Sequence, residues 1–82
     1  MRSLTFQRGE LSIEIEVTDD HIVGQVIPQQ AAQVTVASRQ AALGSVDADE
    51  WGSFILPRPA PGSIRLIWST AESKLVTDWF NV

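Results

Sequence analysis

The residues from Leu11 to Thr18 alternate strictly between apolar and polar side chains, and this alternation limits the fold more than any other feature of the chain. A period of two sustained over this stretch predicts a β-strand with one face in a core and the other in solvent. At helical pitch the same apolar side chains would scatter around the cylinder. Asp19 and Asp20 follow directly and predict a hairpin turn, because aspartate bonds its own backbone and tolerates turn geometry.

Similar short apolar segments recur along the rest of the chain, separated by turn signals about every 8 to 12 residues. This spacing is typical of an all-β domain, so we predict a single antiparallel β-sandwich of about seven to eight strands, transthyretin-like or immunoglobulin-like, spanning residues 1–82. Besides the first strand, the predicted strands are Leu4–Phe6, His21–Ile27, Ala32–Ala37, Ala41–Val46 (a weak strand), Ser53–Leu56, Ser63–Trp68 and Leu75–Val82.

Glycine and proline mark the predicted turns. The acidic stretch from Val46 to Phe54 predicts a tight connection with a glycine-permitted kink at Gly52, followed by a strand whose first large side chain points inward. Gly24 lies inside a predicted strand, which indicates a bulge or the close approach of another group. The three prolines of 57–62 lack amide hydrogens and predict a rigid connector outside the sheets, with a type II turn at Pro61-Gly62.

The inward positions of these strands define the predicted core. Trp68 and Trp79 alternate with apolar neighbours and are both expected to lie at least partly inside it. The predicted core comprises Leu11, Ile13, Ile15, Val17, Ile22, Val26, Val34, Val36, Phe54, Leu56, Ile64, Leu66 and Trp68.

Composition narrows the classes of protein. The chain has 82 residues, enough for one domain, and no cysteine, so it can form neither a disulfide nor a thiolate metal site. Small secreted domains often depend on disulfides, so the absence of cysteine leads us to expect a reducing compartment. The amino end lacks the apolar run of a signal peptide, which favours a cytoplasmic location. No stretch approaches the ~18 apolar residues of a membrane span. The net charge of −4 disfavours nucleic acid, whose backbone requires a basic face.

Candidates for chemistry are few. His21, the single histidine, stands beside Asp19 and Asp20 and could belong to a Ser-His-Asp or pH-sensing group, but a solvated turn histidine is the favoured interpretation. Glu14 and Glu16 share one strand face about 7 Å apart at the Cα atoms, and both are expected in open solvent. We therefore expect a protein that is not an enzyme and has no cofactor.

The acidic turn is the one candidate for a metal. Asp47, Asp49 and Glu50 could supply oxygen ligands to calcium, but they are too few for the 6 to 8 oxygens of a closed site. Asp19, Asp20 or Asp78 could complete the site only if folding brings them near. The favoured interpretation is a turn whose carboxylates bond backbone amides, with no metal.

The candidate interaction surface is Trp51, Arg58 and Glu50. Tryptophan is the residue type richest in binding hot spots, and Trp51 sits in a polar turn with little local reason to be buried. Arg58 is held between Pro57 and Pro59 and could join the same surface.

Four short patterns follow one another between Ile22 and Leu66. They are Ile22-x-Gly24-x-Val26, Ala32-x-Val34-x-Val36, Asp47/Asp49 with Gly52-x-Phe54, and Pro61-Gly62-x-Ile64-x-Leu66. Their combination resembles the transthyretin-like sandwiches, including the carboxypeptidase regulatory-like and collagen-adhesin B-type repeats. The chain departs from the pattern of these families at Ile64, where a tyrosine is common, and it lacks a convincing isopeptide triad, because Lys74 is its single lysine and Asn81 its single asparagine.

A second resemblance covers nearly the whole chain and is carried by the segments Leu11–Val17, Val23–Pro28, Val46–Phe54 and Thr77–Trp79. In the order of these segments the chain resembles small bacterial proteins encoded beside an extracytoplasmic-function sigma factor and a caspase-like peptidase. This resemblance implies a small intracellular accessory module and transfers no catalytic residue.

These observations lead to one expected function and one alternative. We expect a non-catalytic protein-interaction or accessory module in a bacterial signalling or regulatory complex. It would bind an unidentified protein through the loop tips or through an exposed sheet edge, where a homodimer could also form. The alternative is a sandwich that binds a small ligand or glycan through an exposed tryptophan.

Overall fold

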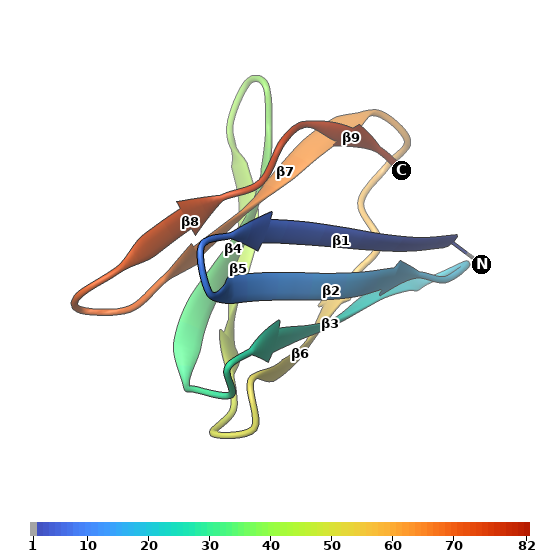
Figure 1. The fold of residues 1–82 in the computed structure, drawn as a ribbon. Helices are drawn as coiled ribbons and strands as arrows, with labels where there is room; N and C mark the ends of the chain where they lie inside the picture. Colours follow the sequence, from blue (N-terminus) through green and yellow to red (C-terminus); the bar gives the residue numbers. More distant parts are fainter. Residues whose placement is uncertain (1) are drawn as a thin grey trace.

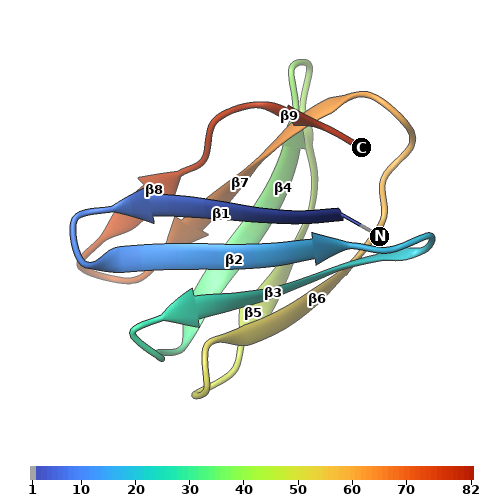
Figure 2. The same ribbon diagram turned by 45° about the vertical axis from the view of Figure 1, so that its right-hand side comes forward.

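Two antiparallel sheets packed as a sandwich make up the computed structural model, which describes residues 2–82 (Figures 1 and 2). The predicted all-β sandwich is confirmed. Among these residues no helix is long and apolar enough to cross a membrane. The first sheet has the order β1-β2-β3-β6: β1 Arg2–Arg8, β2 Leu11–Val17, β3 His21–Ile27 and β6 Ser53–Pro57. The second has the order β5-β4-β7-β8, with β9 also paired to β7: β4 Ala32–Ser38, β5 Ala42–Ala48, β7 Ser63–Ser69, β8 Lys74–Val76 and β9 Phe80–Asn81.

The core lies between the two sheets, where the alternating strands turn their apolar faces toward each other. All predicted core residues are buried except Leu11, which is partly buried and packs against the cluster from the end of β2. Leu11 pairs with Arg8 at the β1–β2 hairpin, so one side of it faces solvent. The core also takes in side chains outside the predicted set, namely Ala48, Leu75 and Phe80.

The carboxyl-terminal segment corrects the prediction of one strand over Leu75–Val82. It forms two short strands, β8 and β9, separated by Thr77–Trp79. The hydroxyl of Thr77 accepts a hydrogen bond from the Leu66 amide at 2.9 Å and donates one to the Asp78 carbonyl at 3.0 Å. A side chain thus replaces a backbone partner at the middle of β7, and the regular ladder breaks there.

Two turn predictions also need correction. The β5–β6 turn is shorter than the acidic stretch, because Asp47 still belongs to β5 and pairs with Gln33. Its kink at Gly52 is confirmed, with φ at 78°. Pro61-Gly62 is not a type II turn, since Gly62 has φ 152° rather than a value near +80°. Gly62 instead exchanges two backbone hydrogen bonds with Val82, of 3.0 and 3.3 Å.

Candidate interaction site

The two sides of the sandwich are closed to different degrees. On the side of β1 and β9, the rings of Phe6 and Phe80 pack with centroids 5.4 Å apart. Nη1 of Arg2 donates to the carbonyl of Asn81 at 2.6 Å and joins the two sheets there. These contacts cover the core along that side.

The opposite side, between β5 and β6, is open. A tight turn connects the two strands, and in it the amide of Gly52 donates to the Asp49 carbonyl at 2.9 Å. Beyond this turn β5 and β6 belong to different sheets. A groove of about 850 Å³ separates β5 from the connector of residues 57–62. The connector runs from β6 to β7 and is coloured yellow to orange in Figure 2. Val36, Leu56 and Ile64 of the core lie among the lining residues of the groove. These three side chains are buried, so the groove ends on the core and its exposed apolar surface comes from the two walls.

One wall of the groove is β5, an edge strand that pairs with β4 alone within the described residues. Val46 faces Val34 across the sheet, yet it is only partly buried while Val34 is fully buried. The register between β4 and β5 shifts by one residue at Leu43, which is therefore a bulge. Leu43 lines the groove and is 51% exposed. β5 thus offers an unpaired backbone edge together with uncovered apolar side chains.

The other wall is the connector of residues 57–62, which is fastened to the β2–β3 turn. The amide of Arg58 donates to the Asp20 carbonyl at 3.0 Å, and its guanidinium donates to the Thr18 carbonyl at 3.0 Å. Prolines at 57, 59 and 61 supply apolar surface but no amide donors. This wall is therefore fixed, apolar and poor in hydrogen-bond donors.

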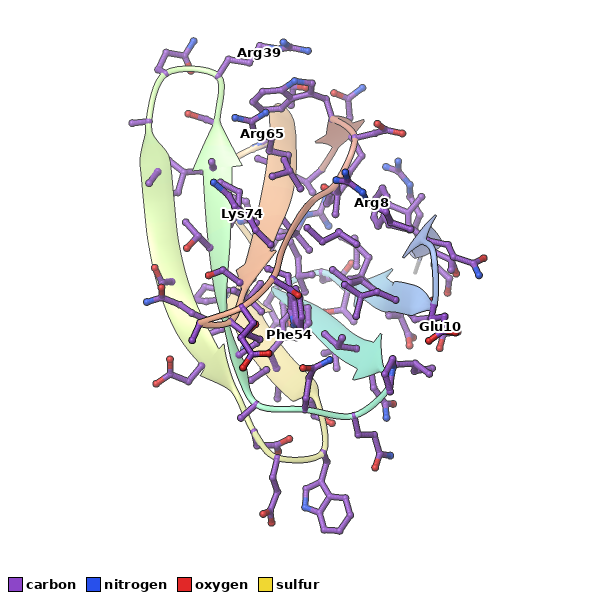
Figure 3. All side chains as sticks on the ribbon, turned by 60° about the vertical axis from the view of Figure 1, so that its left-hand side comes forward. Arg8, Glu10, Arg39, Phe54, Arg65 and Lys74 are labelled. Carbon is purple, nitrogen blue, oxygen red and sulfur yellow. The ribbon has the colours of Figure 1, made fainter. Side chains whose placement is uncertain are left out.

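The charges around the groove are of one sign. Of the described residues that line it, Arg39 and Arg58 are charged and none is acidic, although the whole chain carries −4. Arg39 lies at the tip of the β4–β5 hairpin (Figure 3), with its guanidinium carbon 4.3 Å from the ring centroid of Trp79. The guanidinium carbon of Arg65 lies 4.7 Å from the same ring. Trp79 therefore packs against arginines instead of joining the core, which corrects its predicted placement.

The predicted surface of Trp51, Arg58 and Glu50 is divided by the structure. Glu50 and Trp51 are neighbours in the β5–β6 turn, and Trp51 is 61% exposed. Arg58 follows the other end of β6. The five residues of this strand, in extended conformation, separate Arg58 from the turn by roughly 16 Å. The structure therefore presents two separate places, the turn with Trp51 and the groove with Arg58.

The acidic turn is built as predicted. Oδ1 of Asp49 accepts hydrogen bonds from the amides of Trp51 and Ser53, at 2.9 and 3.0 Å. The carboxylate thus stabilises the hairpin that starts β6. Within residues 2–82 no group of three or more His, Asp or Glu side chains is placed to hold a metal ion.

His21 lies at the start of β3 and is partly exposed. Its Nδ1 is 3.0 Å from Oδ1 of Asp20, and the hydrogen bond and charge of His21 lower the pKa of Asp20. No serine hydroxyl contacts this pair among the hydrogen bonds of the described residues, so they form a turn contact and not a triad. Glu14 on β2 is exposed and Glu16 is partly buried, both on the outer face of the first sheet.

The sequence does not predict the groove. Two of its parts have a signal in the sequence, namely the weak strand around Leu43 and the connector rich in proline. The divergence of β5 from β6, however, depends on which sheet each strand joins. Comparisons with protein-family models, curated proteins and solved structures found no match.

Proposed function

We propose that this chain is a non-catalytic protein-interaction module that binds its partner in the groove between β5 and the connector of residues 57–62. The observation that carries the proposal is the apolar groove along one side of the sandwich, where Leu43 is 51% exposed next to an unpaired strand edge. Proteins rarely leave apolar surface exposed beside an edge strand unless a partner covers it.

The wider role follows the resemblance described above. A module that binds protein without chemistry of its own fits an accessory part of a bacterial signalling or regulatory complex. This part of the proposal rests on the resemblance of Leu11–Val17 and the other matching segments, and the groove supplies a place where a partner could bind.

The experiment compares two matched substitutions in tagged protein expressed in the native cells. Leu43→Lys puts a charge into the groove, whereas Ile55→Lys puts the same charge on the outer face of the first sheet, where Ile55 is 59% exposed. Both sites are exposed, so neither change should unfold the domain. We expect stoichiometric partners to be lost with Leu43→Lys and kept with Ile55→Lys. Equal recovery with both variants would refute the groove as the binding site.

A second candidate function is the binding of a small ligand or glycan at Trp51. It is favoured by the 61% exposure of this indole at a hairpin tip, because sugar rings stack on exposed tryptophan faces. Tryptophan fluorescence titrated with a panel of sugars tests it, with Trp51→Ala as the control that keeps the emission of Trp68 and Trp79. A response that survives in Trp51→Ala, or no response at all, rejects this site.

A further inference from the structure

We propose that the occupant of the groove is an extended peptide segment that pairs with β5, places alternate apolar side chains in the groove, and carries carboxylates toward Arg58 and Arg39. This inference rests on the proposed function and specifies the chemistry of the partner.

The backbone argument selects β5 as the pairing strand. β5 is seven residues long and bonds β4 on one edge only, so its other edge offers unpaired amides and carbonyls. The facing connector cannot offer the same ladder, because prolines at 57, 59 and 61 have no amide hydrogen. A segment in the groove therefore satisfies its backbone on β5 and meets the connector through side chains alone.

The side-chain argument sets the pattern of the partner. Successive side chains of an added strand point to opposite faces, so every second one would enter the groove. There they would meet Val46, Leu56 and Leu43, while the intervening side chains would remain in solvent. A sequence that alternates apolar and polar residues over about seven positions matches the length of β5.

The positive charge of the groove indicates that the partner carries acidic residues. The charged side chains of the groove lining are Arg39 and Arg58. The guanidinium of Arg58 has five N–H donors, and its bond to the Thr18 carbonyl leaves donors for a carboxylate. Two acidic residues, Asp19 and Asp20, lie in the β2–β3 turn that this wall contacts, and the carboxylate of Asp20 is engaged by His21 at 3.0 Å. A second copy of this chain fits less well, because its charge of −4 is repelled by the whole of the first molecule, whereas a short segment can place its carboxylates at the two arginines alone.

The experiment uses fluorescein-labelled decapeptides of alternating valine and threonine that end in either Asp-Glu or Lys-Lys, with binding measured by fluorescence anisotropy at low salt. We expect the acidic peptide to bind about tenfold more tightly than the basic one, and this difference to shrink as salt is raised. Equal affinity of the two peptides would overturn the charge argument.

Protein variants locate the site. Leu43→Ser should lower the affinity for the acidic peptide about tenfold, because an apolar side chain in the groove is lost. The matched Ile55→Ser, on the outer face of the first sheet, should leave this affinity unchanged. Arg58→Gln should remove most of the preference for the acidic peptide. Arg8→Gln, at the end of β1 and away from β5 (Figure 3), is the matched charge control and should keep the preference.

Backbone pairing is tested with peptides methylated on alternate amides. An added strand turns every second amide toward its neighbour, so methylation of one alternate set should abolish binding and methylation of the other should not. Equal loss or equal retention for the two sets overturns strand addition.

The outcomes separate this inference from the proposed function. If neither peptide binds while Leu43→Lys still loses the native partners, the occupant is wrong and the groove remains the site. If Leu43→Lys also keeps every native partner, both proposals fail. A concentration-dependent dimer that Leu43→Ser abolishes would make a second copy the occupant and overturn the peptide inference.

Discussion

The ring of Phe54 lies directly against the backbone of Gly24, its cross-strand partner in the pair of β3 and β6. A β-carbon at Gly24 would stand 2.6 Å from both Cε1 and Cε2 of that ring. Phe54 lies in the interior between the sheets (Figure 3), so it has no free space to move into. The predicted close approach at Gly24 is confirmed, and its partner is identified.

We therefore expect Gly24→Ala to destabilise the domain by about 2 to 3 kcal/mol, because overpacking forces the ring from its position. Adding Phe54→Leu should restore part of this loss, so the two changes combine non-additively in urea unfolding. Gly44→Ala is the matched control, since a β-carbon there meets nothing within 4 Å. Equal losses from Gly24→Ala and Gly44→Ala would show that the close contact carries no energy.

The strands and the core could be read from the sequence because their signal is local. Side chains alternate along a strand regardless of what lies across the sheet. The pattern from Leu11 to Val17 is therefore enough to predict which of its side chains are buried. The same holds for Ile22, Val26 and Leu66, which the pattern places inside and which are fully buried.

The features that could not be read depend on residues far apart in the chain. Trp79 leaves the core because Arg39 and Arg65, from the β4–β5 hairpin and β7, pack over its ring. The groove depends on β5 and β6 joining different sheets, which no local pattern of Leu43 or Pro57 specifies. The sequence thus predicts the candidate site only as individual residues, because no local pattern specifies that the length of β6 separates Trp51 from Arg58.

Thr77 is the buried polar side chain that interrupts the last strand. Its hydroxyl accepts a hydrogen bond from the Leu66 amide and donates one to the Asp78 carbonyl. Thr77→Val keeps the shape and leaves that amide without its side-chain acceptor, so we expect a loss of about 1 to 3 kcal/mol in urea unfolding. Thr77→Ser keeps the hydroxyl and should lose about 1 kcal/mol at most, for one methyl group. A valine variant as stable as the serine variant would contradict this role.

Asp49 separates the turn interpretation from a calcium site. Its carboxylate accepts the amides of Trp51 and Ser53, so Asp49→Ala should cost about 1 to 2 kcal/mol and Asp49→Asn, which keeps Oδ1, clearly less. Asp47→Ala is the control, because Asp47 is exposed on β5. We expect added calcium to leave the thermal midpoint unchanged. A rise of the midpoint with calcium, lost in Asp49→Ala, would establish the metal site instead.

The contact between His21 and Asp20 makes stability depend on pH in the acid range. The hydrogen bond from His21, and then its charge, lower the pKa of Asp20 in the folded state below its ordinary 3.8. A carboxyl whose pKa is lowered by folding stabilises the fold above the unfolded pKa, and this contribution disappears as the pH falls through the folded pKa. Between these two values the unfolded chain binds more protons, so stability should fall as acid is added.

Carboxyl carbon chemical shifts followed by NMR from pH 2 to pH 6 measure this pKa directly. We expect His21→Gln to raise the pKa of Asp20 toward 3.8 and to flatten the acid dependence of unfolding in the same range. Thr18→Val removes a weaker hydrogen bond of 3.4 Å to the same carboxylate and the two 3.1 Å bonds between its hydroxyl and the His21 backbone, but it keeps the imidazole, so it should move the pKa of Asp20 less. An Asp20 pKa that is identical in the wild type and in His21→Gln would show that the contact at 3.0 Å is absent in solution.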